Sequence, residues 1–215
     1  MREEINIDRP LRIALTKGRL EKSSVSLFKT MGLDTSELEN KGRRLILPVG
    51  DYEAVLSKAP DVITYVEHGV CDIGVVGKDT IAEHGNGFYE VIDLGIGKCR
   101  FALACPKGTD FFSGYKRKVV ASKYPKVAKE YFKSKGMDVD IIKIEGSVEL
   151  APLLGLADGI VDIVETGSTL KENGLEVVAE IMPISARVIV NMASMKLRKD
   201  EIEQFLNDLE LASKV

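Results

Sequence analysis

The stretch "GIVDIVETGSTLKENG", residues 159–174, joins a short apolar run to a loop of small hydroxyl residues and then to a polar segment. The run GIVDIV is rich in β-branched residues, which is typical of a buried strand. The polar segment opens near Ser168 and stops at Gly174, and glycine is the usual residue just past a helix end. The stretch therefore predicts a strand followed by a helix, the unit from which α/β proteins are built.

The same alternation runs through the rest of the chain. Short apolar runs predict further strands at 11–15, 72–76, 101–105, 118–122, 140–144, 176–181 and 186–191. Helical spacing of apolar residues predicts helices at 21–32, 60–69, 78–85, 124–136 and 199–212. We therefore expect an α/β fold with mixed sheets and flanking helices.

Two segments have the character of crossovers between lobes. "DLGIGKCR" (93–100) is punctuated by glycine, and in "MPIS" (182–185) Pro183 breaks a run that otherwise continues as a strand. Taken as hinges, they divide the chain into one lobe of residues 1–96 with 184–215 and a second lobe of residues 97–183. This two-lobed arrangement is that of the type II periplasmic-binding-protein fold, and a cleft between lobes is a common ligand site.

Composition excludes several classes of protein. The 215 residues are 45% hydrophobic and 29% charged, as in ordinary soluble globular proteins. The net charge of -3 leaves no basic excess for a nucleic-acid partner, and no apolar run reaches the roughly 18 residues of a membrane span. The three cysteines lack metal-type spacing, and no secretory signal is evident, so we expect a cytoplasmic location.

The hydroxyl-rich loop is suited to bind an anion. Backbone N–H groups at the start of a helix have no acceptor within the helix, and the hydroxyls of Thr166, Ser168 and Thr169 surround them. Gly167 allows the backbone to approach a ligand oxygen without a Cβ atom in the way. The alternative is an ordinary turn in which Ser or Thr caps the helix, since caps use the same residues.

Two acids favour the ligand-binding alternative. Asp162 and Glu165 lie just before the loop, and carboxylates at this place suit sugar hydroxyls or a magnesium ion beside a phosphate. An apolar strand, acids and then T-G-x-T is also the order of the phosphoribosyl-pyrophosphate loop in common phosphoribosyltransferases, which the stretch resembles.

The wider run 145–176 resembles the signature of the ATP phosphoribosyltransferase family, which opens histidine biosynthesis. Nine positions match that pattern in one register: Glu149, Gly155, Ala157, Ile160, Asp162, Thr166, Gly167, Thr169 and Leu170. The similarity extends to residues 13–20, 61–79, 94–106 and 120–125. It implies a glycosyltransferase that transfers the phosphoribosyl group of phosphoribosyl pyrophosphate to N1 of ATP and releases pyrophosphate.

The resemblance also assigns roles to residues. It implies that phosphoribosyl pyrophosphate, with Mg2+ on the substrate phosphates, is bound by Asp162, Glu165, Thr166, Gly167, Ser168, Thr169 and Leu170. Negative charge builds on the leaving pyrophosphate, so cations are expected to matter most for catalysis.

Three cations are the catalytic candidates. Lys17 and Arg19 follow the first predicted strand, at a carboxyl end where α/β sheets bind ligands. From spacing alone a solvated basic turn is the favoured alternative, and the resemblance reverses that preference. Family members carry an arginine that reaches the phosphates from a neighbouring subunit, and we assign this role to Arg44.

Three further residues are expected to support the site. Related sequences tend to have arginine three residues before Asp61, where this chain has Lys58, which keeps the charge but loses the bidentate fork. Glu145 and Glu149 lie at a second strand-to-helix junction, where they either contact ribose or adenine or serve only as acids in the first turn of a helix. We identify no general base and no set of protein ligands for a resident metal ion.

The resemblance extends to partners. The chain is too short for the C-terminal regulatory domain of the long form, so it resembles the short form. That form implies a homodimer of catalytic chains that assembles with a regulatory subunit similar to histidyl-tRNA synthetase. The competing hypothesis is a cytoplasmic two-lobed sensor or binding protein for a phosphorylated sugar, because fold alone does not decide function.

Overall fold

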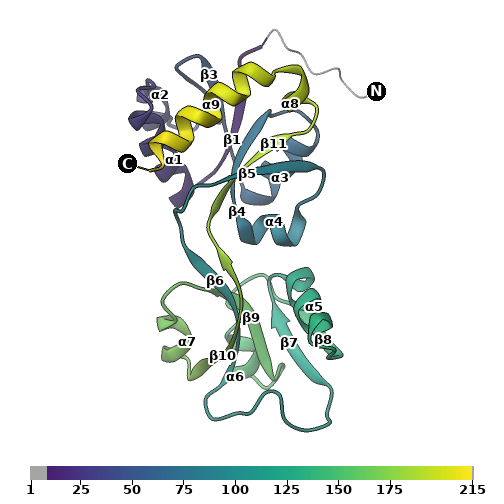
Figure 1. The fold of residues 1–215 in the computed structure, drawn as a ribbon. Coiled ribbons are helices and arrows are strands. Elements are labelled where there is room, and N and C mark those ends of the chain that lie inside the picture. Colours follow the sequence, from purple (N-terminus) through teal and green to yellow (C-terminus); the bar gives the residue numbers. More distant parts are fainter. Residues whose placement is uncertain (1–8, 215) are drawn as a thin grey trace. The chain divides into compact units, whose positions relative to one another are not determined.

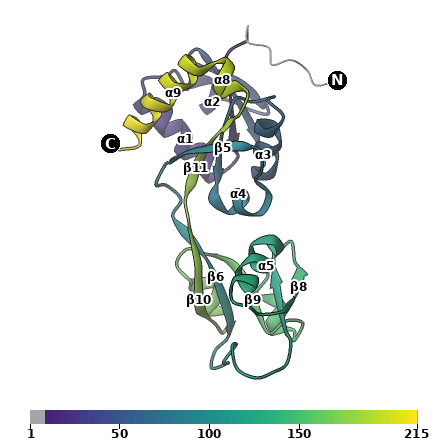
Figure 2. The same cartoon turned by 45° about the vertical axis from the view of Figure 1, so that its right-hand side comes forward.

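The structure, a computed structural model, describes residues 9–214. These residues form two compact units, shown in Figures 1 and 2. The first unit comprises the residues up to Gly97 and those from Ser185 onward, and the second unit comprises Lys98–Ile184. The sequence predicted the boundaries between residues 96 and 97 and between residues 183 and 184, each one residue before the boundary in the structure.

The first unit contains a six-stranded mixed sheet. Its strands are β1 (Arg12–Thr16), β2 (Ile46–Val49), β3 (Tyr52–Ser57), β4 (Ile73–Gly77), β5 (Phe88–Asp93) and β11 (Ala186–Asn191), in the order β2-β3-β1-β4-β11-β5. Strand β1 is parallel to β3 and to β4, whereas β2 and β11 are antiparallel to their neighbours. The carboxyl ends of β1, β3 and β4 therefore meet at one edge of this sheet.

Helices cover both faces of that sheet. They are α1 (Arg19–Thr30), α2 (Ser36–Glu39), α3 (Ala59–Glu67), α4 (Lys78–His84), α8 (Ser194–Leu197) and α9 (Lys199–Ala212). Ile13 and Leu15 of β1 pack in one core cluster with Phe28 of α1 and Phe205 of α9, whereas Ala14 packs in a second cluster with residues of α3. This alternation follows from the period of two along a strand, and it makes β1 a buried strand on both faces.

The buried carboxylate of Asp72, just before β4, holds the start of α8 and the start of α9 against the sheet of the first unit. The side chain of Asp72 has no exposed surface, and its oxygens accept hydrogen bonds from Arg9 (2.6 Å), Ser194 (2.7 Å), Arg198 (3.4 Å) and the backbone N–H of Arg12 (2.9 Å). Paired in this way, the charge is tolerated in the interior, and loss of the carboxylate removes a fully buried ion-pair partner from both Arg9 and Arg198.

The second unit contains a five-stranded mixed sheet. Its strands are β6 (Cys99–Pro106), β7 (Lys118–Ser122), β8 (Val139–Lys143), β9 (Gly159–Val164) and β10 (Leu175–Ile184), in the order β10-β6-β9-β7-β8. Strand β7 is parallel to β8 and β9, whereas β6 is antiparallel to β9 and β10. The helices of this unit are α5 (Pro125–Ser134), α6 (Leu150–Leu153) and α7 (Ser168–Glu172).

Pro183 does not break a strand, so the interpretation drawn from the sequence is wrong on this point. Strand β10 continues through Pro183 to Ile184, and Pro183 pairs with Arg100 of β6. Because β10 is an edge strand, the missing N–H of proline removes no hydrogen bond to an outer neighbour.

Within residues 9–214, no helix combines the length and the apolar character that crossing a membrane requires.

Candidate functional site

A pocket of about 320 Å³ lies at the carboxyl end of β9 in the second unit. All seven residues predicted to bind phosphoribosyl pyrophosphate line it, and so does Glu149. The full lining is Glu149, Asp162, Ile163, Val164, Glu165, Thr166, Gly167, Ser168, Thr169 and Leu170. A contiguous strand-to-helix junction, joined by one residue from the start of α6, therefore forms the wall of this pocket.

The loop between β9 and α7 has the geometry of an anion cradle. Gly167 has a φ of 80°, in the left-handed region that glycine enters without strain. Helix α7 begins at the next residue, and its first internal hydrogen bond runs from the N–H of Lys171 to the carbonyl of Gly167 (3.1 Å). The N–H of Ser168 donates to Thr166 Oγ1 at 3.4 Å, whereas the N–H groups of Thr169 and Leu170 have no acceptor within the helix and can donate to a ligand.

The hydroxyl groups of the loop are already organised. Thr166 Oγ1 and Ser168 Oγ are 3.1 Å apart, within hydrogen-bonding distance, and both side chains are exposed. Leu170 is buried in a core cluster with Val164 of β9, so it anchors the start of α7 against the sheet. The exposed hydroxyls can therefore turn toward a ligand while the backbone beneath them stays fixed.

Asp162 is a half-buried carboxylate on β9 inside this pocket. The pKa of Asp162 is raised to about 6, mainly because the carboxyl group is buried. The charge of Glu149 also raises this pKa, whereas the N–H of Ile163 and the charge of Lys123 lower it. The carboxyl group is therefore ionised at neutral pH but poorly solvated. Hydrogen-bond donors stabilise such a carboxylate, and the vicinal hydroxyls of a sugar are suitable donors.

Arg100 fastens the entrance of the loop. Its Nη1 donates to the carbonyl oxygen of Glu165 at 3.4 Å, and its Nε lies 2.7 Å from Oε1 of Glu180 on β10. The sequence indicated only that Arg100 lies near a crossover. Its proximity to the loop follows from the antiparallel pairing of β6 with β9, which sets Arg100 opposite Val164.

In the first unit, three of the predicted cations gather at one edge of the sheet. Lys17 follows β1 and Lys58 follows β3, and these two strands pair in parallel with Thr16 opposite Ser57. The N–H of Lys17 donates to the carbonyl of Ser57 at 2.9 Å. Arg19 opens α1 two residues beyond Lys17, and all three cationic side chains are exposed.

Arg44 is engaged within its own chain. Its guanidinium pairs with Glu37 of α2 and donates to the carbonyl oxygens of Asn40 (3.1 Å) and Lys41 (3.3 Å). The ion pair is exposed, so solvent screens it and a phosphate can compete for the guanidinium.

Glu145 lies apart from the pocket. Its carboxylate is 2.7 Å from the ammonium of Lys143, and both side chains are exposed. The structure brings Glu149, but not Glu145, together with the loop.

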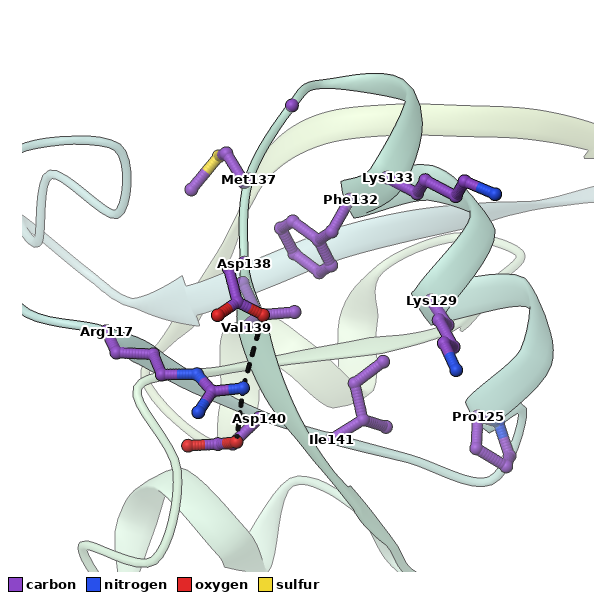
Figure 3. A pocket seen from close by; sticks show the side chains of 11 residues that line it. Arg117, Pro125, Lys129, Phe132, Lys133, Met137, Asp138, Val139, Asp140 and Ile141 are labelled. Carbon is purple, nitrogen blue, oxygen red and sulfur yellow. Dashed lines mark hydrogen bonds and ion pairs between the residues drawn. The ribbon is translucent and has the colours of Figure 1, made fainter.

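A larger hollow, of about 720 Å³, lies between α5 and β8 (Figure 3). None of the predicted site residues lines it. Its guanidinium group, on Arg117, is paired with Asp138 (3.1 Å) and Asp140 (3.0 Å), as Figure 3 shows. Two carboxylates beside one arginine make this part of the hollow a poor place for a phosphorylated substrate.

The sequence of the chain is similar to ATP phosphoribosyltransferases, both in a family model and in individual relatives. The model of the ATP phosphoribosyltransferase family HisG matches residues 58–211. ATP phosphoribosyltransferase of Clostridium kluyveri is 61% identical over 206 residues, which cover 95% of this chain and 94% of the relative. The enzyme of Clostridium acetobutylicum is 58% identical over 205 residues, which cover 94% of this chain and 95% of the relative.

Solved structures agree with the sequence relatives. The ATP phosphoribosyl transferase (HisG:HisZ) complex from Thermotoga maritima contains a chain that is 36% identical, with a TM-score of 0.82 over 95% of this chain and 98% of that chain. The periplasmic aliphatic sulphonate binding protein SsuA from Escherichia coli is 14% identical, with a TM-score of 0.56 over 94% of this chain and 68% of that chain. The second likeness concerns the fold alone, and it confirms the type II periplasmic-binding-protein architecture expected from the sequence.

Proposed function

The chain belongs to the ATP phosphoribosyltransferase family, and we propose that the pocket at the end of β9 holds phosphoribosyl pyrophosphate during catalysis. The reaction transfers the phosphoribosyl group to N1 of ATP, gives N1-(5-phosphoribosyl)-ATP and pyrophosphate, and is the first step of histidine biosynthesis. The observation that supports this location is that all seven predicted residues line one pocket.

The pocket suits the two ends of a sugar phosphate. The first turn of α7 and the hydroxyls beside it bind the 5-phosphate, because unpaired N–H groups at a helix start favour an anion. Asp162 and Glu165 face the ribose and accept hydrogen bonds from its hydroxyls. The residues before and within the loop thereby fix the orientation of the sugar.

The chemical step needs alignment more than proton transfer. Adenine N1 is a neutral nucleophile, so the reaction requires no general base. Charge accumulates on the departing pyrophosphate, and fixed cations stabilise it. We assign this task to Lys17, Arg19 and Arg44, with Lys58 in support, because the first three carry the resemblance to the family and the fourth lies beside Lys17 at the same sheet edge.

Magnesium is proposed to enter with the phosphates of the substrates. Among residues 9–214, no group of three or more His, Cys, Asp or Glu side chains is placed to hold a metal ion. Magnesium uses one or two protein carboxylates with substrate phosphates, and Glu165, exposed at the rim of the pocket, fits that limited part. When bound, the ion neutralises phosphate charge.

We also propose the assembly expected for the short form. The related Thermotoga maritima structure is a HisG:HisZ complex, which supports a regulatory HisZ-type partner for this chain. A regulatory subunit similar to histidyl-tRNA synthetase and a homodimer of catalytic chains together form the proposed hetero-oligomer. A dimer also allows Arg44 to exchange Glu37 for a substrate phosphate of the neighbouring chain.

An activity assay tests this function. The purified chain is mixed with ATP, magnesium and phosphoribosyl pyrophosphate, with and without the regulatory subunit, and the ultraviolet change of N1-substituted adenine is followed. Thr169→Val is expected to raise the KM for phosphoribosyl pyrophosphate about tenfold, since one hydrogen bond to a charged oxygen is lost. Thr64→Val, on the exposed face of α3, is the matched control and leaves KM unchanged.

Absence of turnover in both conditions, with phosphoribosyl pyrophosphate still bound, contradicts the proposed function and favours a sensor of phosphorylated sugars.

A further inference from the structure

The pocket at the end of β9 lacks cations of its own. Its lining contains the carboxylates of Glu149, Asp162 and Glu165 and no lysine or arginine. Phosphoribosyl pyrophosphate carries a phosphate at one end and a pyrophosphate at the other, and phosphate groups are held most strongly by cationic donors. The lining itself therefore offers no cation to either phosphate group.

Strand order determines which elements flank the pocket on its two sides. The loop leaves β9 toward β10, against which α7 packs, so the 5-phosphate cradle lies on the β6–β10 side of β9. Strand β7 neighbours β9 on the opposite side, an arrangement that Figure 1 shows. Seen from a 5-phosphate at α7 and a ribose over Asp162, the end of β7 is the neighbouring strand end on the far side of β9.

Lys123 is the first residue after β7 and lies at this place. Strands β7 and β9 are parallel with Ser122 opposite Val161, so the next position along each strand brings Lys123 beside Asp162. Neighbouring strands are about 4.8 Å apart, well within the reach of a lysine side chain. The charge of Lys123 in fact lowers the pKa of Asp162 against the larger effect of burial.

The backbone around Lys123 is held while its side chain is available. The hydroxyl of Ser122 donates to the carbonyl of Val161 at 2.6 Å and accepts from the N–H of Tyr124 at 2.9 Å. The ring of Tyr124 packs edge-on against Phe101 with centroids 4.8 Å apart. Lys123 itself is exposed, and its ammonium has no ion pair or hydrogen bond with the residues that the structure describes.

We propose that Lys123 binds the pyrophosphate group of phosphoribosyl pyrophosphate, as a substrate-binding residue from β7 in addition to those of the loop. The inference rests on the proposed function of the pocket. The sequence alone did not single out Lys123, because only the pairing of β7 with β9 places it beside the loop.

Binding of two ligands distinguishes the proposed role of Lys123 at the pyrophosphate from the role of the loop at the 5-phosphate. Phosphoribosyl pyrophosphate and ribose 5-phosphate share the 5-phosphate and the ribose, but only the first has the pyrophosphate. Calorimetric titration of the purified full chain with each ligand, in the presence of magnesium, therefore measures the contribution of the pyrophosphate end separately.

Lys123→Met is expected to weaken phosphoribosyl pyrophosphate about tenfold and to leave ribose 5-phosphate unchanged, since a charged hydrogen bond to the pyrophosphate is lost. Lys123→Arg restores most of the affinity because the charge is retained. Lys129→Met removes an exposed lysine of α5 that does not line the pocket, and it leaves both affinities unchanged.

The inference is overturned if Lys123→Met weakens both ligands equally or neither of them, while the unmodified chain binds both. If the unmodified chain binds neither ligand, the proposed function of the pocket fails first, and this inference fails with it. Thermal denaturation of each variant confirms that loss of affinity is not loss of fold.

Discussion

The substitution Gly167→Ala tests whether phosphate binding needs a glycine in the loop between β9 and α7. Its effect on substrate affinity can be measured separately from its effect on the free energy of unfolding. At this position a Cβ atom meets nothing closer than Cγ1 of Val164 at 3.7 Å, an ordinary van der Waals distance. The cost of alanine in the free chain therefore comes from its φ of 80° alone. That left-handed conformation costs about 1–2 kcal/mol for a residue with a Cβ atom.

Binding is expected to suffer more than stability. The same Cβ atom stands where ligand oxygens approach the backbone, and relaxation of φ turns the first N–H groups of α7 away from the phosphate. Loss of one hydrogen bond to a charged group is about 1.5–3 kcal/mol. The Kd for phosphoribosyl pyrophosphate should accordingly rise by about 10- to 100-fold.

Gly136→Ala is the matched control. Gly136 follows α5 with a φ of 67°, nothing lies within 4 Å of its Cβ position, and it does not line the pocket. Urea denaturation should show a similar loss of stability for both variants, whereas calorimetry should show weaker phosphoribosyl pyrophosphate binding for Gly167→Ala alone. Unchanged affinity of a folded Gly167→Ala variant refutes the assignment of the phosphate to this loop.

Three further predictions concern buried groups. Asp162→Asn should raise the free energy of unfolding at pH 7.5 by about 1–3 kcal/mol. Burial raises the pKa of Asp162 from 3.8 to about 6, so its ionisation opposes folding above that pH, and the gain should shrink as pH falls from 6 toward 4 in urea titrations. Asp72→Ala should lower the free energy of unfolding by about 3–5 kcal/mol, because Arg9 and Arg198 lose a fully buried partner, and an unchanged denaturation midpoint contradicts this. Burial raises the pKa of the Cys71 thiol to about 12, so iodoacetamide should modify half-exposed Cys99 before Cys71 in the native chain at pH 8, as peptide mass spectrometry can check.

Strands and helices with uniform local patterns were predictable from the sequence. The runs at 118–122, 159–164 and 186–191 coincide with β7, β9 and β11, and the helix at 199–212 coincides with α9. Strands β2, β3 and β5 were not predicted. Strand β3 is an inner strand, but only residues 54–56 of its sequence YEAVLS form a continuous apolar run, which is too short to stand out. Strands β2 and β5 are edge strands: β2 contains Pro48, and β5 is half-exposed and carries Glu90 and Asp93. Edge strands tolerate proline and charge, which removes the apolar signal of an inner strand.

The loop residues of the candidate site were predictable because they are contiguous in the sequence. Thr166, Gly167 and Thr169 belong to one strand-to-helix junction, so a local motif contains their whole arrangement. Arg100 on β6 lies 65 residues before Glu165, and Lys123 after β7 lies 39 residues before Asp162, so both reach the junction from distant parts of the chain. Pairing of distant strands is not encoded in any local pattern, and this is why the sequence did not identify these two cations as neighbours of the loop.

A crystal structure of the chain with phosphoribosyl pyrophosphate and magnesium shows directly whether the loop between β9 and α7 binds the 5-phosphate. We predict 5-phosphate oxygens about 3 Å from the backbone nitrogens at the start of α7, with ribose hydroxyls at the carboxylate of Asp162. A substrate phosphate bound elsewhere, with the loop from Glu165 to Leu170 making no contact with it, would show that this loop is not the phosphate site.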